Sequence, residues 1–161
     1  MQSNQSSEQT IRLPKLLKWQ KTVALSDARF KILRCGRRTG KTFFIIIDSC
    51  SLALKYPNLS IAYIGLTYGH AKDVVWEDYL KVLGDGTDHS LVAYKNSQEL
   101  LIKLHNGSRI KLYSWDSIDN MLGKKYHKVY GDEVAVAKNF RKAWDDVIEP
   151  TLLDYHGEAW L

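Results

Sequence analysis

One short glycine-containing stretch constrains this chain more than any other part of its sequence. The segment from Arg34 to Thr42 reads RCGRRTGKT. It nearly matches G-x-x-x-x-G-K-[ST], the pattern of a loop whose backbone N–H groups surround a phosphate. A short apolar segment at 30–33 precedes the loop, and a nearly continuous apolar run at 41–56 follows it. The sequence therefore predicts a strand, a phosphate-binding loop and a buried helix, in the order that such a site requires.

The residues of this loop have separate expected roles. Its successive backbone N–H groups and the positive end of the following helix are expected to converge on a phosphate. Gly40 allows the backbone to approach the ligand closely. Lys41 is expected to neutralise the β- and γ-phosphates of ATP, and the Thr42 hydroxyl to bind Mg²⁺. The predicted nucleotide-binding residues of the loop are Gly36, Arg37, Arg38, Thr39, Gly40, Lys41 and Thr42. The alternative interpretation is a basic turn that carries G-K-T by chance.

Two features of the loop depart from the common pattern. Cys35 stands where the first glycine is usual, and a cysteine accepts a sharp turn there only if its φ angle stays negative. Arg37 and Arg38 lie inside the loop. A guanidinium in that position can stabilise the charge that develops on the γ-phosphate, but it can equally face solvent or DNA phosphates. We expect one of the two arginines to be catalytic, and the sequence does not choose between them.

A pair of acidic residues provides the second half of the predicted site. Asp132 and Glu133 follow the short apolar segment Val129-Tyr130-Gly131, and open α/β sheets place their sites at the carboxyl ends of strands. Asp132 is expected to bind Mg²⁺, and Glu133 to act on the attacking water. The alternative is an exposed acidic pair in a turn. Together with Lys41, these residues predict a hydrolase that acts on ATP.

The remaining pattern predicts an α/β fold. Helices are expected at 13–20, 41–56, 70–83 and 139–148, and strands at 30–33, 60–65, 98–104, 109–115, 128–132 and from 158 onward. The turn His105-Asn106-Gly107-Ser108 contains Asn-Gly between two alternating runs, which strongly indicates a hairpin. Strands that alternate with helices predict a P-loop NTPase sheet of the RecA-like (ASCE) type, flanked by helices and carrying a β-hairpin insertion.

Length and composition limit the class of protein. A chain of 161 residues with 45% hydrophobic residues has the size of one soluble domain. Residues 1–10 are polar and are predicted to form a flexible tail, which leaves 11–161 as the domain. The longest apolar run is too short to span a bilayer, so we expect a cytoplasmic protein without a membrane partner. The net charge of +5 favours an anionic partner such as nucleic acid.

With these residues in view, the chain resembles the N-terminal ATPase region of the large subunit of tailed-bacteriophage terminases, the DNA-packaging motor. The resemblance covers about residues 13–161. Members of that family commonly carry Gly-Arg-Arg-Ser/Thr-Gly-Lys-Thr/Ser, which residues 36–42 match. They often carry an upstream glutamine that recognises adenine, and Gln20 in LPKLLKWQ corresponds to it, although by itself it is only a polar residue at a helix end. The segment SIDNMLGKKYHKVYGDEVA resembles the family's approach to its acidic motif.

The resemblance implies the ligands and the partners of the protein. It implies ATP and Mg²⁺ as ligands and double-stranded DNA as the molecule that is moved into a procapsid. It also implies the terminase small subunit and the procapsid portal as partners, a ring of identical subunits for the full-length protein, and a location in the host cytoplasm. The family's coupling motif and nuclease domain follow the part that is matched here. We therefore expect an ATPase domain that is incomplete at its C-terminus, has no nuclease activity and leaves an unpaired strand edge.

Two other functions remain open from the sequence. One is a helicase-like ATPase that acts on nucleic acid, and the other is a nucleotide- or DNA-binding module that does not hydrolyse ATP. The basic cluster at 124–128 bears on both, because it could bind DNA phosphates or form a solvated turn. Release of phosphate from ATP separates the enzymes from the binding module.

Overall fold

The computed structural model describes residues 14–36 and 38–161, and the predicted tail at 1–10 lies outside them. Within the described residues the chain forms a seven-stranded sheet of order β1-β7-β6-β2-β5-β4-β3. The strands are β1 (Phe30–Lys31), β2 (Ser60–Gly65), β3 (Val92–Asn96), β4 (Leu101–Leu104), β5 (Arg109–Ser114), β6 (Lys128–Gly131) and β7 (Glu158–Trp160). The first five strands in the spatial order are parallel, whereas β4 and β3 are antiparallel. The predicted α/β sheet is confirmed.

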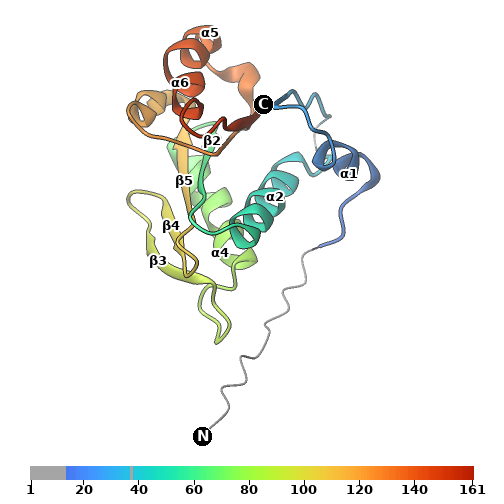
Figure 1. Cartoon of the computed structure of the whole chain (residues 1–161), viewed down its shortest axis with the longest axis vertical. Coiled ribbons are helices and arrows are strands. Elements are labelled where there is room, and N and C mark those ends of the chain that lie inside the picture. The colour runs from blue at the N-terminus through green and yellow to red at the C-terminus, as the bar shows by residue number, and fades with distance from the viewer. Residues whose placement is uncertain (1–13, 37) are drawn as a thin grey trace, which may run out of the picture.

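Helical segments cover both faces of this sheet (Figure 1). They are α1 (Lys18–Ala24), α2 (Lys41–Lys55), α3 (Tyr68–His70), η1 (Ala71–Val75), α4 (Trp76–Val82), η2 (Trp115–Met121), η3 (Val134–Val136), α5 (Phe140–Ala143), η4 (Trp144–Ile148) and α6 (Glu149–Leu152). Helices α2 and α4 pack on one face through one core cluster, and η4 and α6 pack on the other face through a second cluster. Among the described residues, no helix has the length and apolar character that a membrane span needs.

The long helix α2 is central to the first face because nearly all of its middle is apolar. Phe44, Ile45 and Ile46 are at most 1% exposed, and they pack against β2 and β5. On β5 the alternation of side chains assigns each residue to one face. Ile110 and Leu112 join the cluster with α2, whereas Tyr113 belongs to the cluster on the other face. The register of β5 is therefore fixed by the burial of apolar side chains on both faces.

The predicted hairpin forms between β4 and β5. The backbone N–H of Leu104 donates to the carbonyl of Ser108 over 2.8 Å, and Gly107 has a φ angle of 85°. A Cβ atom at Gly107 would lie 2.2 Å from Oδ1 of Asn58, so both the backbone conformation and the space demand glycine there. This Asn-Gly turn is the part of the hairpin that the sequence predicted most directly.

Three predictions about the elements were wrong. The helix expected at 13–20 begins only at Lys18, because Leu17 has an extended backbone and its N–H donates to Oε1 of Gln20 over 2.8 Å. Strand β3 was missed because its side chains are mostly exposed and show no alternation of polar and apolar residues. Strand β7 was expected to leave an unpaired edge, but it lies between β1 and β6 and pairs with both. The edges of the sheet are β1 and β3.

Candidate nucleotide site

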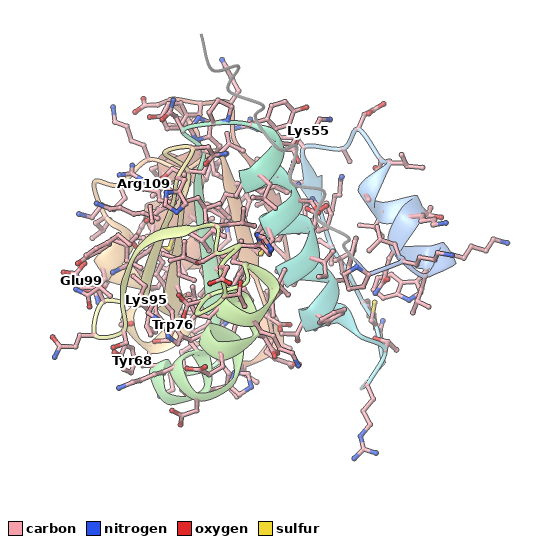
Figure 2. The ribbon with its side chains drawn as sticks, turned by 90° about the horizontal axis from the view of Figure 1, so that it is seen from below. Lys55, Tyr68, Trp76, Lys95, Glu99 and Arg109 are labelled. Carbon is pink, nitrogen blue, oxygen red and sulfur yellow. The ribbon has the colours of Figure 1, made fainter. Side chains whose placement is uncertain are left out.

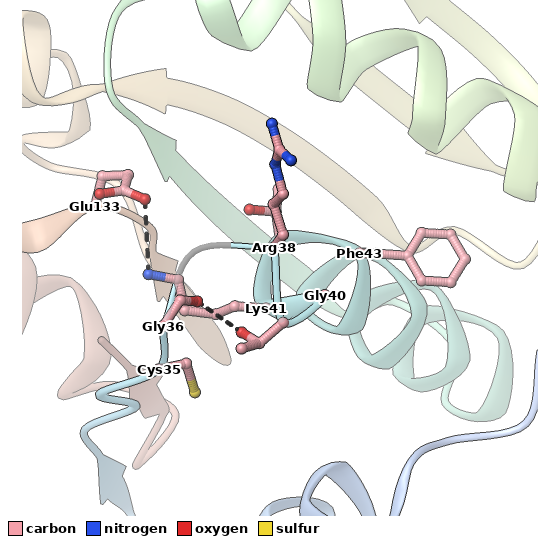
Figure 3. Close-up of a pocket in the computed structure, with 9 residues that line it drawn as sticks. Cys35, Gly36, Arg38, Gly40, Lys41, Phe43 and Glu133 are labelled. Carbon is pink, nitrogen blue, oxygen red and sulfur yellow. Dashed lines mark hydrogen bonds and ion pairs between the residues drawn. The ribbon is translucent and has the colours of Figure 1, made fainter.

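The glycine-containing loop connects β1 to the first turn of α2 and forms one wall of a pocket. Gly40 occupies the position before α2 with a φ angle of 82°, a left-handed conformation that favours glycine. The Thr39 hydroxyl donates to the carbonyl of Gly36 over 2.9 Å and tightens the loop. The pocket has a volume of about 470 Å³ and is lined by residues 35–36, 38–43 and Glu133. Figure 3 shows these side chains around the start of the helix.

Cys35 fits this loop without a strained backbone. It is partly buried and lines the pocket. Among the described residues other than glycine, those with a positive φ angle include Arg38 but not Cys35. The turn at Cys35 therefore stays in the region that a residue with a side chain accepts. The replacement of the first glycine leaves the loop connected to β1 and α2 in the expected order.

The first turn of α2 meets the carboxyl end of β6. The Thr42 hydroxyl donates a hydrogen bond of 2.5 Å to Oδ2 of Asp132. The Lys41 ammonium lies 3.2 Å from Oδ1 of the same carboxylate and 3.9 Å from Oε1 of Glu133. Asp132 is only 2% exposed, so burial of its charge requires partners of this kind. The fold thus brings together the four residues that the sequence singled out for phosphate and metal chemistry.

Two aromatic residues that sequence analysis missed also hold Asp132. The Tyr63 hydroxyl, on the neighbouring strand β2, donates to Oδ2 of Asp132 over 3.2 Å. Burial, reinforced by the Asp132 charge, holds the pKa of Tyr63 well above its ordinary value, so the phenol keeps its proton and remains a donor. The indole N–H of Trp115 donates to the backbone carbonyl of Asp132 over 2.7 Å. Both residues have the sequence signature of ordinary core positions.

Glu133 differs from Asp132 in exposure and in backbone conformation. Its side chain is 56% exposed, and its φ angle of 54° lies in the left-handed region. A non-glycine residue pays a conformational cost there, and such residues concentrate at functional sites. Its N–H donates to Oδ1 of Asp132 over 3.0 Å. The Glu133 carboxylate faces Lys41 across the pocket (Figure 3), where it is open to water.

Gln20 lies beside the loop although it is far away in the sequence. It is 5% exposed and belongs to α1. Its amide nitrogen donates to the carbonyl of Gly40 over 3.4 Å, and its amide oxygen accepts from Leu17. An amide group has a second N–H and a further lone pair, so Gln20 keeps one donor and one acceptor for another molecule.

The two loop arginines have different standing in the structure. Arg38 is exposed, lines the pocket and has a φ angle of 62°. Its guanidinium projects outward from the loop in Figure 3. Arg37 lies outside the described residues. The prediction that one of the two is catalytic stays a prediction.

Known proteins with similar sequences and folds are large subunits of phage terminases. The family model described as "Terminase large subunit, T4likevirus-type, N-terminal" matches residues 32–146. The terminase large subunit of Escherichia phage T5 is 29% identical over 134 residues, which cover 80% of this chain and 29% of that protein. The chain thus spans less than a third of the length of this curated relative.

Solved structures show the same fold. The large terminase ATPase domain of Thermus phage P74-26 superposes with a TM-score of 0.73 at 20% identity, over 91% of this chain and 63% of that domain. The large terminase of another thermophilic bacteriophage, solved in complex with ADP, gives a TM-score of 0.65 at 18% identity, over 89% of this chain and 37% of the other. The family model covers most of the chain, and the chain therefore belongs to the T4likevirus-type family of terminase large subunits, whose N-terminal region it matches.

Proposed function

We propose that this chain is the ATP-hydrolysing motor domain of a viral DNA-packaging terminase. One observation carries the proposal: Lys41 and Thr42, at the start of α2, contact Asp132 and Glu133 at the end of β6 within 2.5–3.9 Å. A phosphate-binding loop next to two carboxylates is the arrangement that phosphoryl transfer to water requires. The fold is that of terminase ATPase domains, and a terminase of this fold has been solved with ADP.

The donor groups at the site suit Mg²⁺. Thr42 and Asp132 offer a hydroxyl and a carboxylate oxygen within 2.5 Å of each other, and Mg²⁺ prefers oxygen ligands completed by phosphates and water. These two residues would hold the ion, which supplies positive charge to the phosphate oxygens when bound. Tyr63 and Trp115 keep Asp132 in place through its side chain and its backbone.

The protein's own residues carry the hydrolytic step. The Lys41 ammonium binds the β- and γ-phosphates in competition with the two carboxylates that it contacts in this structure. The Glu133 carboxylate accepts a proton from a water molecule whose oxygen attacks the γ-phosphorus. The bond between the γ-phosphorus and the β–γ bridging oxygen breaks as the new bond forms. The products are ADP and inorganic phosphate.

Two further groups complete the proposed nucleotide site. Gln20 uses its remaining donor and acceptor to recognise the adenine base, since it lies beside Gly40. One of Arg37 and Arg38 stabilises the charge on the γ-phosphate during transfer. Gly36 and Thr39 shape the loop that holds the phosphates.

The free energy of hydrolysis would drive double-stranded DNA into a procapsid. This part of the proposal rests on family membership and on the net charge of +5, which favours an anionic partner. The family also suggests the terminase small subunit and the portal as partners, a ring of identical subunits, and action in the host cytoplasm. Phosphate release from ATP, measured with Mg²⁺ in the presence and absence of duplex DNA, tests the proposal. Nucleotide binding without phosphate release would instead support the non-hydrolysing module.

A further inference from the structure

One part of the sheet carries charged side chains where helices cover the rest. On β4, Ile102 and Leu104 join the core beneath α2 and α4, so Lys103 lies on the opposite face. On β5, Ile110 and Leu112 point to the same core, and Lys111 lies with Lys103. In Figure 2, Arg109 lies on the side of the strands away from α2. This face of the hairpin is open to solvent.

A groove of about 430 Å³ runs over this face, and its walls are strongly basic. The basic residues that line it are Lys103, Arg109, Lys111, Lys124 and Lys125. The only acidic residue among its lining residues is Glu99, all of which belong to the described part of the chain. Lys124 and Lys125 come from the segment before β6, so two distant parts of the sequence build the basic groove. The positive charge is concentrated here by the fold.

Some of these cations are fixed and others have no acidic partner. The Arg109 guanidinium donates from Nε to the Ser60 hydroxyl over 2.7 Å. Lys111 lies 3.8 Å from a carboxylate oxygen of Glu99, and Lys125 pairs with Asp154. Within residues 14–36 and 38–161, Lys103, Arg109 and Lys124 form no ion pair.

The excess of positive charge also affects Lys111. Burial lowers its pKa, Lys124 lowers it further, and Glu99 only partly opposes both effects. An anion bound between Lys111 and Lys124 would relieve this repulsion. The groove is therefore electrostatically prepared for a partner that carries several negative charges.

The groove continues toward the nucleotide site. A second hollow shares Glu99, Lys111, Tyr113 and Lys124 with it and extends to Ser117 and Asn120 of η2. The same segment η2 begins with Trp115, whose indole N–H donates to the backbone carbonyl of Asp132 over 2.7 Å. A molecule in the extended groove would thus touch the segment that holds the acidic residue of the nucleotide site.

We propose that this basic groove binds the phosphate backbone of duplex DNA. The proposal rests on the proposed function, for which it assigns the surface that contacts DNA. Regularly spaced phosphates fit a row of lysines and an arginine, because each cation that neutralises a phosphate releases condensed counterions. Hydroxyl and amide donors such as Ser117 and Asn120 suit phosphate oxygens as well.

The salt dependence of DNA binding tests the groove. We compare Lys103→Ala/Lys124→Ala with Lys55→Ala/Lys81→Ala, which removes the same charge from α2 and α4 on the other face of the sheet. The pairs are matched, since Lys103 and Lys55 each lie over a tyrosine ring, and Lys81 and Lys124 are both exposed. Fluorescence anisotropy with a labelled duplex is measured from low to physiological salt. Circular dichroism checks that each variant is folded.

We expect the groove variant to bind duplex DNA on the order of 10- to 100-fold more weakly at low salt. The slope of log K against log salt should fall by about 1.8, since each lost phosphate contact removes about 0.9. The control pair should keep the wild-type slope, and Lys103→Arg/Lys124→Arg should restore it. Equal slopes for the groove and control pairs would overturn the proposal, as would a wild-type chain that does not bind DNA.

Other results separate this proposal from its neighbours. If Lys103→Ala/Lys124→Ala abolishes a self-association seen by light scattering and leaves DNA affinity intact, the groove holds a second copy of the chain, and the DNA proposal fails. If the slopes behave as expected but no phosphate is released from ATP, the groove proposal stands and the proposed function fails. If ATP is hydrolysed and the slopes are equal, the reverse holds.

Discussion

The hydroxyl of Thr42 donates a 2.5 Å hydrogen bond to Oδ2 of Asp132, across 90 positions of sequence. This bond joins the first turn of α2 to the end of β6 and brings two oxygen ligands to one point. The same Asp132 oxygen accepts from Tyr63, and the other oxygen of this carboxylate lies next to Lys41. The contact therefore defines where phosphate and metal chemistry meet in the fold.

Removal of the Thr42 hydroxyl should weaken nucleotide binding only when Mg²⁺ is present. In Thr42→Ala, affinity for ATP with Mg²⁺ should fall by about tenfold or more, which corresponds to about 1.4 kcal/mol. Affinity without Mg²⁺ should hardly change, because the backbone of the loop is kept. Titration calorimetry at both conditions measures this, with Thr42→Ser as the control that keeps the hydroxyl. The same response to Mg²⁺ in both variants would contradict a role in metal binding.

Gln20 should provide selectivity for adenine. In Gln20→Ala, the preference for ATP over GTP should fall toward one, because the amide complements the adenine edge and not that of guanine. The variant should also lose about 1–2 kcal/mol of unfolding free energy, since the N–H of Leu17 loses its acceptor. Nucleotide competition and urea unfolding measure the two effects. Lys21→Ala, on the same helix, is the control, and an unchanged ATP preference in Gln20→Ala would rule out base recognition.

The two loop arginines should differ in their effect on turnover. Arg37→Ala and Arg38→Ala should give kcat values at least about 100-fold apart, because a guanidinium on the γ-phosphate contributes 10³–10⁵ in related enzymes. Steady-state phosphate release with saturating ATP measures this difference. Nearly normal rates in both variants would mean that the stabilising arginine comes from elsewhere, such as a neighbouring subunit.

The sequence predicted the parts of the site that depend on local chemistry. The phosphate loop requires glycine, lysine and threonine at fixed spacing, and the acidic pair follows a short apolar strand. Both motifs can therefore be found without a structure. Gln20 was identified through family resemblance alone, because its contact with Gly40 depends on how α1 packs.

The parts that could not be predicted depend on strand order and register. Tyr63 reaches Asp132 because β2 lies beside β6, with Tyr63 paired to Tyr130. Nothing in the segment SIAYIG distinguishes this tyrosine from a core residue. In the same way, β7 pairs with β1 across most of the chain, and the basic groove combines Lys103 with Lys124 only after the sheet has formed. Contacts of this kind follow from tertiary structure and not from a local pattern.

Phosphate release from ATP by the wild-type chain, Lys41→Ala and Glu133→Gln tests the proposed chemistry most directly. The wild-type chain should release phosphate only with Mg²⁺. Glu133→Gln should still bind ATP but release phosphate at least about 100-fold more slowly, since it loses a general base, and Lys41→Ala should be inactive. Glu77→Gln, an exposed acid on α4, should behave as wild type. Wild-type turnover in Lys41→Ala, or an unchanged rate in Glu133→Gln, would contradict the assignment of an ATP-hydrolysing site.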